Sequence, residues 1–162
     1  MQHSSFHSFV IIWISFFISM CLEAIPWPGL FDMLRPSWIF LFLAYWVLAL
    51  PQRINICTAF ILGIFWDVIV GSGLGVHALA LSIVIYIIAF YYQLLRNMAI
   101  WQQATIFMLL SFLVKILVFW AENLFQNVAF NSQYLWGGVV NFILWPWLYL
   151  LLRRVRRRFA LR

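Results

Sequence analysis

The chain has 162 residues, of which 67% are hydrophobic, 20% are aromatic and only 9% carry a charge. A soluble domain of this composition lacks the polar residues needed to cover its surface, so we expect an all-α integral membrane protein. The net charge of +6 does not indicate a nucleic-acid partner, because most of the excess lies in one C-terminal tail.

Six apolar runs follow one another along the chain, and we predict that each is a transmembrane helix. The hydrocarbon core of a bilayer is about 30 Å thick, so a spanning helix needs about 20 mostly apolar residues. Together the runs form one domain that ends in a basic tail, residues 153–162. The predicted spans are residues 9–25, 37–50, 54–70, 76–95, 100–121 and 134–152.

The connections between these runs carry clear turn signals. Pro26-Trp27-Pro28-Gly29 ends the first run, since proline cannot continue the helical hydrogen bonds and glycine tolerates turn geometry. Only Pro51-Gln52-Arg53 separates the second and third runs, which predicts an antiparallel hairpin. Gly71-Ser72-Gly73-Leu74-Gly75 follows a membrane helix, so we interpret it as a tight turn and not as a phosphate-binding loop.

The second run is short for a membrane span. It lies between Pro36 and Pro51, and a helix over residues 37–50 rises only about 21 Å. Three explanations fit this length. The helix extends back through residues 33–35, the bilayer thins locally, or the segment forms a re-entrant hairpin.

Basic residues alternate between the connections. Arg53, Arg96 and the tail lie in every second gap, whereas the third and fifth gaps hold no Lys or Arg. Cationic loops are retained on the cytoplasmic side during insertion, so the pattern predicts six spans with both termini in the cytoplasm. Arg35 is the one basic residue that this topology places outside.

Four polar side chains on four different predicted helices lie at one depth in the outer half of the membrane: Glu23, Asp67, Lys115 and Asn141. Ionisable groups inside a bilayer are costly, so they mark a structural or functional site. With Arg35 they form our candidate cluster for partner binding or structural stabilisation. An ion path is the third reading, but the inner half has no titratable groups to continue it.

The specific pairing that we predict within this cluster is Asp67 with Lys115, because the two residues have opposite charge at nearly equal depth. Glu23 is the alternative partner for the Lys115 ammonium. The sequence predicts no catalytic residues, no metal site and no cofactor. Cys21 and Cys57 lie on different helices without metal-ligand spacing, and we expect both thiols to be buried as small hydrophobic groups.

An ordered set of short motifs then points to a family. It comprises Trp27-Pro28, Arg35-Pro36-Ser37-Trp38, the block from Ala49-Leu50-Pro51-Gln52-Arg53 through Gly63 and Asp67 to Gly75-Val76, Tyr92-Gln93-Leu94-Leu95-Arg96-Asn97, Trp101-Gln102-Gln103, Trp120-Ala121-Glu122, Trp145-Pro146-Trp147 and Arg153-Arg154-Val155-Arg156. Over essentially its whole length the chain resembles the rod shape-determining protein MreD family of Gram-negative bacteria. Lys115 falls on none of these motifs.

The resemblance implies a non-catalytic, multi-pass protein of the bacterial inner membrane that belongs to the cell-elongation machinery. It implies three protein partners: an MreC-type bitopic membrane protein, the actin-like MreB filament and the peptidoglycan synthases of the lateral wall. It also implies a six-helix fold like that of the substrate-binding components of energy-coupling-factor transporters.

Two functions therefore compete. The favoured one is a membrane scaffold that couples the cytoplasmic filament and MreC to wall synthesis and so maintains rod shape. The alternative is a small-molecule-binding component of a transporter. In either case we expect the basic tail to meet anionic lipid headgroups or an acidic cytoplasmic partner. The tail residues concerned are Arg153, Arg154, Arg156, Arg157 and Arg158.

Overall fold

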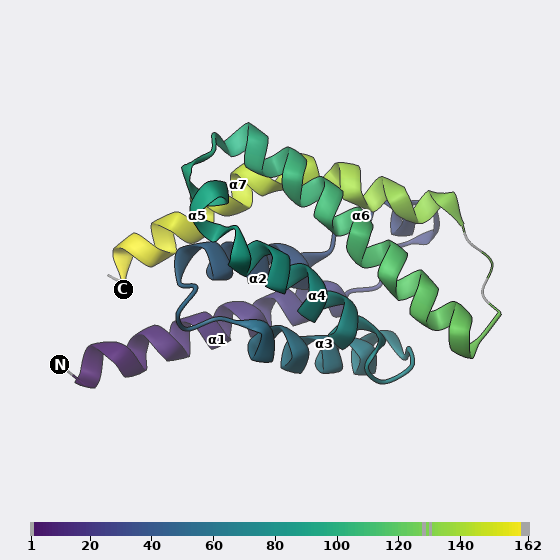
Figure 1. Ribbon diagram of the computed structural model, residues 1–162, viewed down its shortest axis with the longest axis horizontal. Coiled ribbons are helices and arrows are strands. Elements are labelled where there is room, and N and C mark those ends of the chain that lie inside the picture. The colour runs from purple at the N-terminus through teal and green to yellow at the C-terminus, as the bar shows by residue number, and fades with distance from the viewer. Residues whose placement is uncertain (1, 128, 130, 160–162) are drawn as a thin grey trace.

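A computed structural model describes residues 2–127, 129 and 131–159, and within them the protein is a bundle of α-helices (Figure 1). The six predicted runs each contain an α-helix, but the fourth run breaks at Tyr91 into a longer and a shorter helix. The elements are α1 (Gln2–Ala24), the 3-10 helix η1 (Gly29–Leu34), α2 (Trp38–Ala49), α3 (Ile56–Val70), α4 (Val76–Phe90), α5 (Tyr92–Asn97), α6 (Ile100–Phe125), the 3-10 helix η2 (Ser132–Leu135) and α7 (Trp136–Arg158).

The helices have the length and composition of a membrane protein. Three segments are long and apolar enough to cross a bilayer, namely Phe6–Ala24, Gly29–Ala49 and Ile100–Phe125. Two apolar helices, α3 and α4, are shorter. The surface of the bundle carries many large exposed apolar side chains, which lipid tails would solvate.

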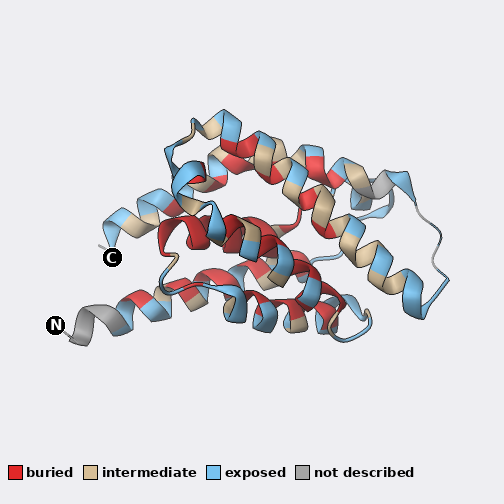
Figure 2. Cartoon of the chain, viewed as in Figure 1, coloured by how far each residue is buried: buried red, intermediate tan, exposed pale blue. Residues whose placement is uncertain are grey.

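Helix α2 forms the centre of the bundle. Its sequence is apolar all round, and a helix of this kind is stable only when neighbours cover every side. Accordingly, α2 contacts every other α-helix, and all its residues from Ile39 to Ala49 are buried (Figure 2).

The second predicted span is a broken helix. A residue before proline is disfavoured in the α region, and Arg35, which precedes Pro36, has an extended backbone (φ −59°, ψ 116°). The α-helix does not extend through residues 33–35, so the first of our three explanations is wrong. Instead η1 comes first and α2 begins at Trp38, with a length of about 18 Å.

The hairpin of α3 and α4 is packed unusually closely. Gly63 faces the main chain of Ala78, and a Cβ atom at Gly63 would lie 2.6 Å from the Ala78 nitrogen. The connecting loop is the predicted tight turn. Gly71 and Gly75 adopt positive φ values of 73° and 97°, which glycine tolerates and other residues rarely adopt.

The two termini lie at the same end of the bundle (Figure 1). The α2–α3 connection, which holds Arg53, and the α5–α6 connection lie at this end too. The opposite end carries the α1–α2 segment, the α3–α4 loop and the α6–α7 connection.

The prediction of buried thiols is wrong. Cys21 and Cys57 are both exposed on the surface of the bundle. They lie on the outward faces of α1 and α3, where the apolar thiol needs only lipid contact and no protein core.

Candidate functional site

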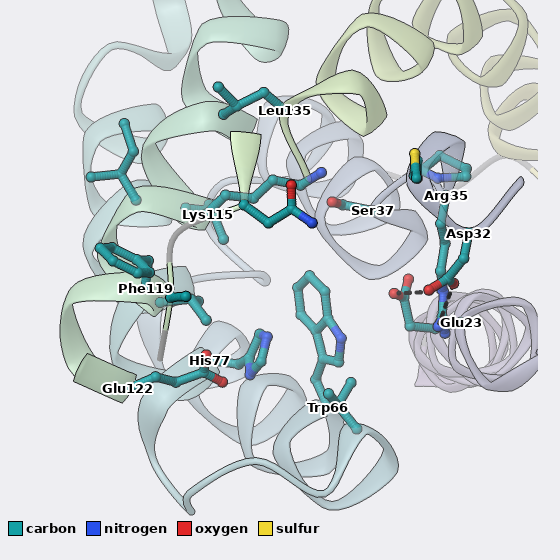
Figure 3. A pocket seen from close by; sticks show the side chains of 18 residues that line it. Glu23, Asp32, Arg35, Ser37, Trp66, His77, Lys115, Phe119, Glu122 and Leu135 are labelled. Atoms are coloured by element: carbon teal, nitrogen blue, oxygen red, sulfur yellow. Dashed lines mark ion pairs between the residues drawn. The ribbon is translucent and has the colours of Figure 1, made fainter. Parts of the chain in front are cut away.

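A cavity of about 390 Å³ opens at the end of the bundle opposite the termini. Figure 3 shows α6 on one side of it, the α1–α2 segment on the other, and Trp66 and His77 between them. Its charged lining is mixed, with two bases and three acids. These are Arg35, Lys115, Glu23, Asp32 and Glu122.

The chain just before α2 forms one wall of the cavity. There Pro36 and the extended Arg35 interrupt the helix, and η1 precedes them. Non-helical backbone at membrane depth is tolerated where it lines a cavity, which fits Arg35, Pro36 and Ser37 along this wall.

Glu23 holds the start of α2 in place. The Trp38 main-chain N–H donates to Glu23 Oε2 at 3.0 Å, and Arg35 Nε lies 3.6 Å from Glu23 Oε1. The Ser37 side chain makes no capping hydrogen bond of its own. The Trp38 N–H also donates to the Pro36 carbonyl oxygen at 3.1 Å, so two acceptors share it. A carboxylate at a helix N-terminus is in addition favoured by the helix dipole. Glu23 therefore caps α2 from another helix.

Asn141 of α7 completes this support from the other side. The Ser37 main-chain N–H donates to Asn141 Oδ1 at 3.1 Å, and both residues are buried. At the start of α2, the main-chain N–H groups of Ser37 and Trp38 thus donate hydrogen bonds to side chains of α7 and α1, two helices that are far apart in sequence.

Lys115 of α6 reaches across to the same region. A Cβ atom at Gly137 would lie 2.5 Å from the Lys115 Nζ and 2.5 Å from the Arg35 carbonyl oxygen, so both atoms approach the bare α-carbon. The charge that attracts the ammonium is Glu23. Gly137 fits here mainly because a Cβ would clash with the Arg35 main-chain oxygen, which cannot rotate away as the lysine head can.

The predicted pairing of Asp67 with Lys115 is wrong. Both Asp67 oxygens accept hydrogen bonds within the α3–α4 hairpin: Oδ1 from Ser72 Oγ at 2.8 Å and from the His77 main-chain N–H at 2.9 Å, and Oδ2 from the Gly75 N–H at 2.8 Å. Depth along a helix does not fix the direction of a side chain, and Asp67 points into its own hairpin.

His77 is the site residue that the sequence analysis missed. Its Nδ1 lies 2.8 Å from Asp67 Oδ1, and its ring stacks on Trp66 with centroids 4.6 Å apart. Trp66 and His77 line the cavity, whereas the fully buried Asp67 lies behind them. The available signal was the position of His77 two residues after Gly75, in the first turn of the helix that pairs with α3.

The structure therefore divides the predicted cluster. Glu23, Arg35 and Lys115 line the cavity together. Asn141 supports the start of α2, and Asp67 supports His77. Among the described residues, no group of three His, Cys, Asp or Glu side chains is placed to hold a metal ion.

The tail arginines lie at the opposite end, on the last turns of α7. Four of them, Arg153, Arg154, Arg157 and Arg158, are exposed, and we call them the exposed tail arginines. Arg156 is half-buried and interacts with the hydroxyl group of Tyr45 in α2. One tail arginine thus anchors α7 to the core and the other four face outward.

Comparison with known proteins identifies the family. The family model of the rod shape-determining protein MreD matches residues 4–155. The rod shape-determining protein MreD of Haemophilus influenzae is 44% identical over 157 residues, which cover 94% of this chain and 97% of that protein. No solved structure matches the chain, so the likeness to transporter components stays a prediction. The chain belongs to the MreD family of non-enzymatic, multi-pass membrane proteins that determine rod shape.

Proposed function

We propose that this protein is a non-catalytic, six-span scaffold of the cell-elongation machinery in the bacterial inner membrane. In this role it joins the actin-like MreB filament and an MreC-type bitopic membrane protein to the peptidoglycan synthases of the lateral wall. The observation that carries the proposal is the polar pocket at one end of an apolar bundle, in a chain of the MreD family.

The topology we propose has both termini in the cytoplasm and the pocket on the periplasmic side. Its support is that Arg53 and the exposed tail arginines lie at the end of the bundle that holds both termini. Reporter fusions test it: fusions at Gly75 and Asn131 are expected to read as periplasmic, and fusions at Arg53 and after Arg162 as cytoplasmic. A cytoplasmic signal at Gly75 would rule out the six-span topology.

The pocket is the proposed binding site for a segment of the MreC-type partner. A phosphate group of a lipid would meet the carboxylates of Glu23 and Glu122, and a lipid tail would meet charges of both signs. A polypeptide segment carries apolar, acidic and basic groups together, so it suits this mixed lining. Arg35 and Lys115 are the basic groups available to it.

At the other end of the bundle, we propose that the exposed tail arginines contact anionic lipid headgroups of the cytoplasmic leaflet. Each basic residue near such a surface contributes about 1 kcal/mol of attraction. This contact would fix the depth and orientation of α7.

Depletion of the protein tests the function as a whole. Rod-shaped cells are expected to round up through failed lateral wall synthesis, and purification from membranes is expected to recover the MreC-type protein and the wall synthases. Lys115→Met should reduce the recovery of the MreC-type protein. Leu124→Ala is the matched control, because Leu124 lies on the same helix and is 81% exposed, outside the pocket.

The alternative function is a small-molecule-binding component of a transporter. The observation that favours it is the cavity volume of about 390 Å³, which lies in the range of small-molecule sites. This function predicts that a transporter ATPase copurifies with the protein, and that depleted cells keep their rod shape and are rescued by a nutrient.

A further inference from the structure

We propose that His77 is a hydrogen-bond acceptor for the segment that occupies the pocket, and that Asp67 is the residue that positions it. The Nε2 atom of His77 accepts a hydrogen bond from an N–H or O–H group of that segment. This inference rests on the proposed function, because it takes a partner polypeptide as the occupant.

The imidazole ring of His77 is held on two sides. Its Nδ1 lies 2.8 Å from Asp67 Oδ1, and the His77 main-chain N–H donates to the same oxygen at 2.9 Å. Its face lies on the Trp66 indole, at a tilt of 34° between the two rings. Because these contacts fix both the plane and the edge of the ring, its remaining nitrogen has a defined direction.

That direction is towards the cavity. The ring lines the cavity together with Trp66, while Asp67, on the Nδ1 side, is fully buried and does not line it (Figure 3). Nε2 lies across the ring from the Nδ1 edge that Asp67 holds. It is therefore the ring nitrogen that a molecule in the pocket can reach.

Asp67 also decides what Nε2 can do. An ionised carboxylate only accepts hydrogen bonds, so the hydrogen of a neutral imidazole is placed on Nδ1. Nε2 is then left as an acceptor. Ser72 reinforces this arrangement, because its hydroxyl donates to Asp67 Oδ1 at 2.8 Å and keeps the carboxylate in place. Histidines that bind metals are oriented in the same way: one ring nitrogen binds the metal, and the other donates its hydrogen to a carboxylate.

An acceptor of this kind complements the rest of the lining. Lys115 and Arg35 supply positive donors, the Glu23 carboxylate is already engaged by Trp38 and Arg35, and Asp32 and Glu122 are charged acceptors. A neutral acceptor beside an aromatic face suits a neutral donor, such as a main-chain amide or a side-chain amide or hydroxyl. His77 thus selects occupants that present such a donor at the Trp66 end of the pocket.

Two substitutions at His77 separate this role from structural support. The amide of asparagine can replace Nδ1 towards Asp67 but does not reach the position of Nε2. The longer glutamine side chain places an amide oxygen near that position. We therefore expect His77→Asn to weaken binding of the full-length MreC-type protein about tenfold. His77→Gln restores an acceptor but loses the contact with Asp67, so we expect it to weaken binding only about threefold. Binding is measured by equilibrium titration of each purified variant in lipid nanodiscs.

The outcomes separate the two proposals. If the wild type does not bind the MreC-type protein, the proposed function fails. If the wild type binds and His77→Asn binds equally well, or both variants are equally weak, the acceptor role is overturned. Thermal unfolding of each variant in nanodiscs checks that Asp67 and its neighbours still support the fold.

A second measurement keeps His77 unchanged, so it does not depend on whether a variant at that position folds. The chain has three histidines, so ¹⁵N-histidine labelling with substitutions of His3 and His7 isolates the His77 signals. We expect Nδ1 to be protonated in the free protein and the Nε2 resonance to move when the partner is added. An Nε2 resonance that does not change on saturation with the partner, or a hydrogen on Nε2 in the free protein, with or without one on Nδ1, would overturn the proposal.

Discussion

Replacing Gly63 by alanine tests whether the α3–α4 crossing positions the pocket wall. The added Cβ would lie 2.6 Å from the Ala78 main-chain nitrogen and closer still to its Cα, so the helices must separate by about 1 Å to reach ordinary contact. Main-chain atoms cannot rotate away as a side chain does. We expect a loss near the upper end of the overpacking range, about 3 kcal/mol of unfolding free energy.

The same separation should disturb the site, because Asp67 lies one turn after Gly63 and His77 precedes Ala78. The hydrogen bond between Asp67 and His77 would lengthen from 2.8 Å, so partner binding should weaken together with stability. Stability is measured as the free energy of unfolding in detergent by denaturant titration, alongside membrane abundance and cell shape.

Gly73→Ala is the matched control for this substitution. A Cβ atom at Gly73 meets only the Val76 side chain at 3.5 Å, which is ordinary contact, so the change should cost less than about 0.5 kcal/mol. The double variant Gly63→Ala with Ala78→Gly should not recover, because the clash is with Ala78 main-chain atoms that glycine retains. If Gly63→Ala is as stable as Gly73→Ala, the helices do not cross as described and the reasoning fails.

Three further substitutions follow from the site. Glu23→Gln and Lys115→Met should each cost about 3 kcal/mol of unfolding free energy, and the double variant should cost clearly less than their sum. The effects of Asp67→Asn and Lys115→Met, in contrast, should be additive. Denaturant unfolding of the single and double variants measures the coupling in each of the two pairs. Gly137→Ala should cost about 1–3 kcal/mol by the same titration, because its Cβ would clash with the Arg35 carbonyl oxygen as well as the lysine head. A neutral result would show that the Arg35 main chain does not lie against Gly137 as described. Replacing the exposed tail arginines by glutamine should leave part of the population with its C-terminus outside, as read by a C-terminal topology reporter; uniform orientation would contradict this role.

The sequence analysis predicted those features that depend on local chemistry. Proline and glycine marked the ends of helices and the tight turn, and apolar runs marked the helices. The pairing of Asp67 was wrong for a physical reason. The rise per residue gives the depth of a side chain, but its direction depends on the rotation of the helix, and packing of the whole bundle sets that rotation. His77 was missed because its role requires Asp67 and Trp66 of the neighbouring helix.

The start of α2 required the same kind of non-local information. Pro36 predicted a break or a first-turn proline equally well, since both are common positions for proline. The outcome was decided by side chains distant in the chain, because a helix N-terminus buried in an apolar bundle leaves N–H groups that cost several kcal/mol each when unpaired. Asn141 and Glu23 accept hydrogen bonds from the main-chain N–H groups of Ser37 and Trp38, and these bonds offset the free-energy cost of the break.

This arrangement has a consequence for how the protein can bind a partner. Glu23 and Asn141 stabilise the broken helix whether or not the pocket is occupied, so their loss should affect folding and binding together. His77 has a different place: its Nδ1 edge belongs to the hairpin and its Nε2 edge to the pocket. A substitution that keeps the first contact and removes the second should change binding without changing stability. In the proposed function, the residues before α2 form one wall of the pocket, and the occupant is selected by residues that α2 does not need for its support.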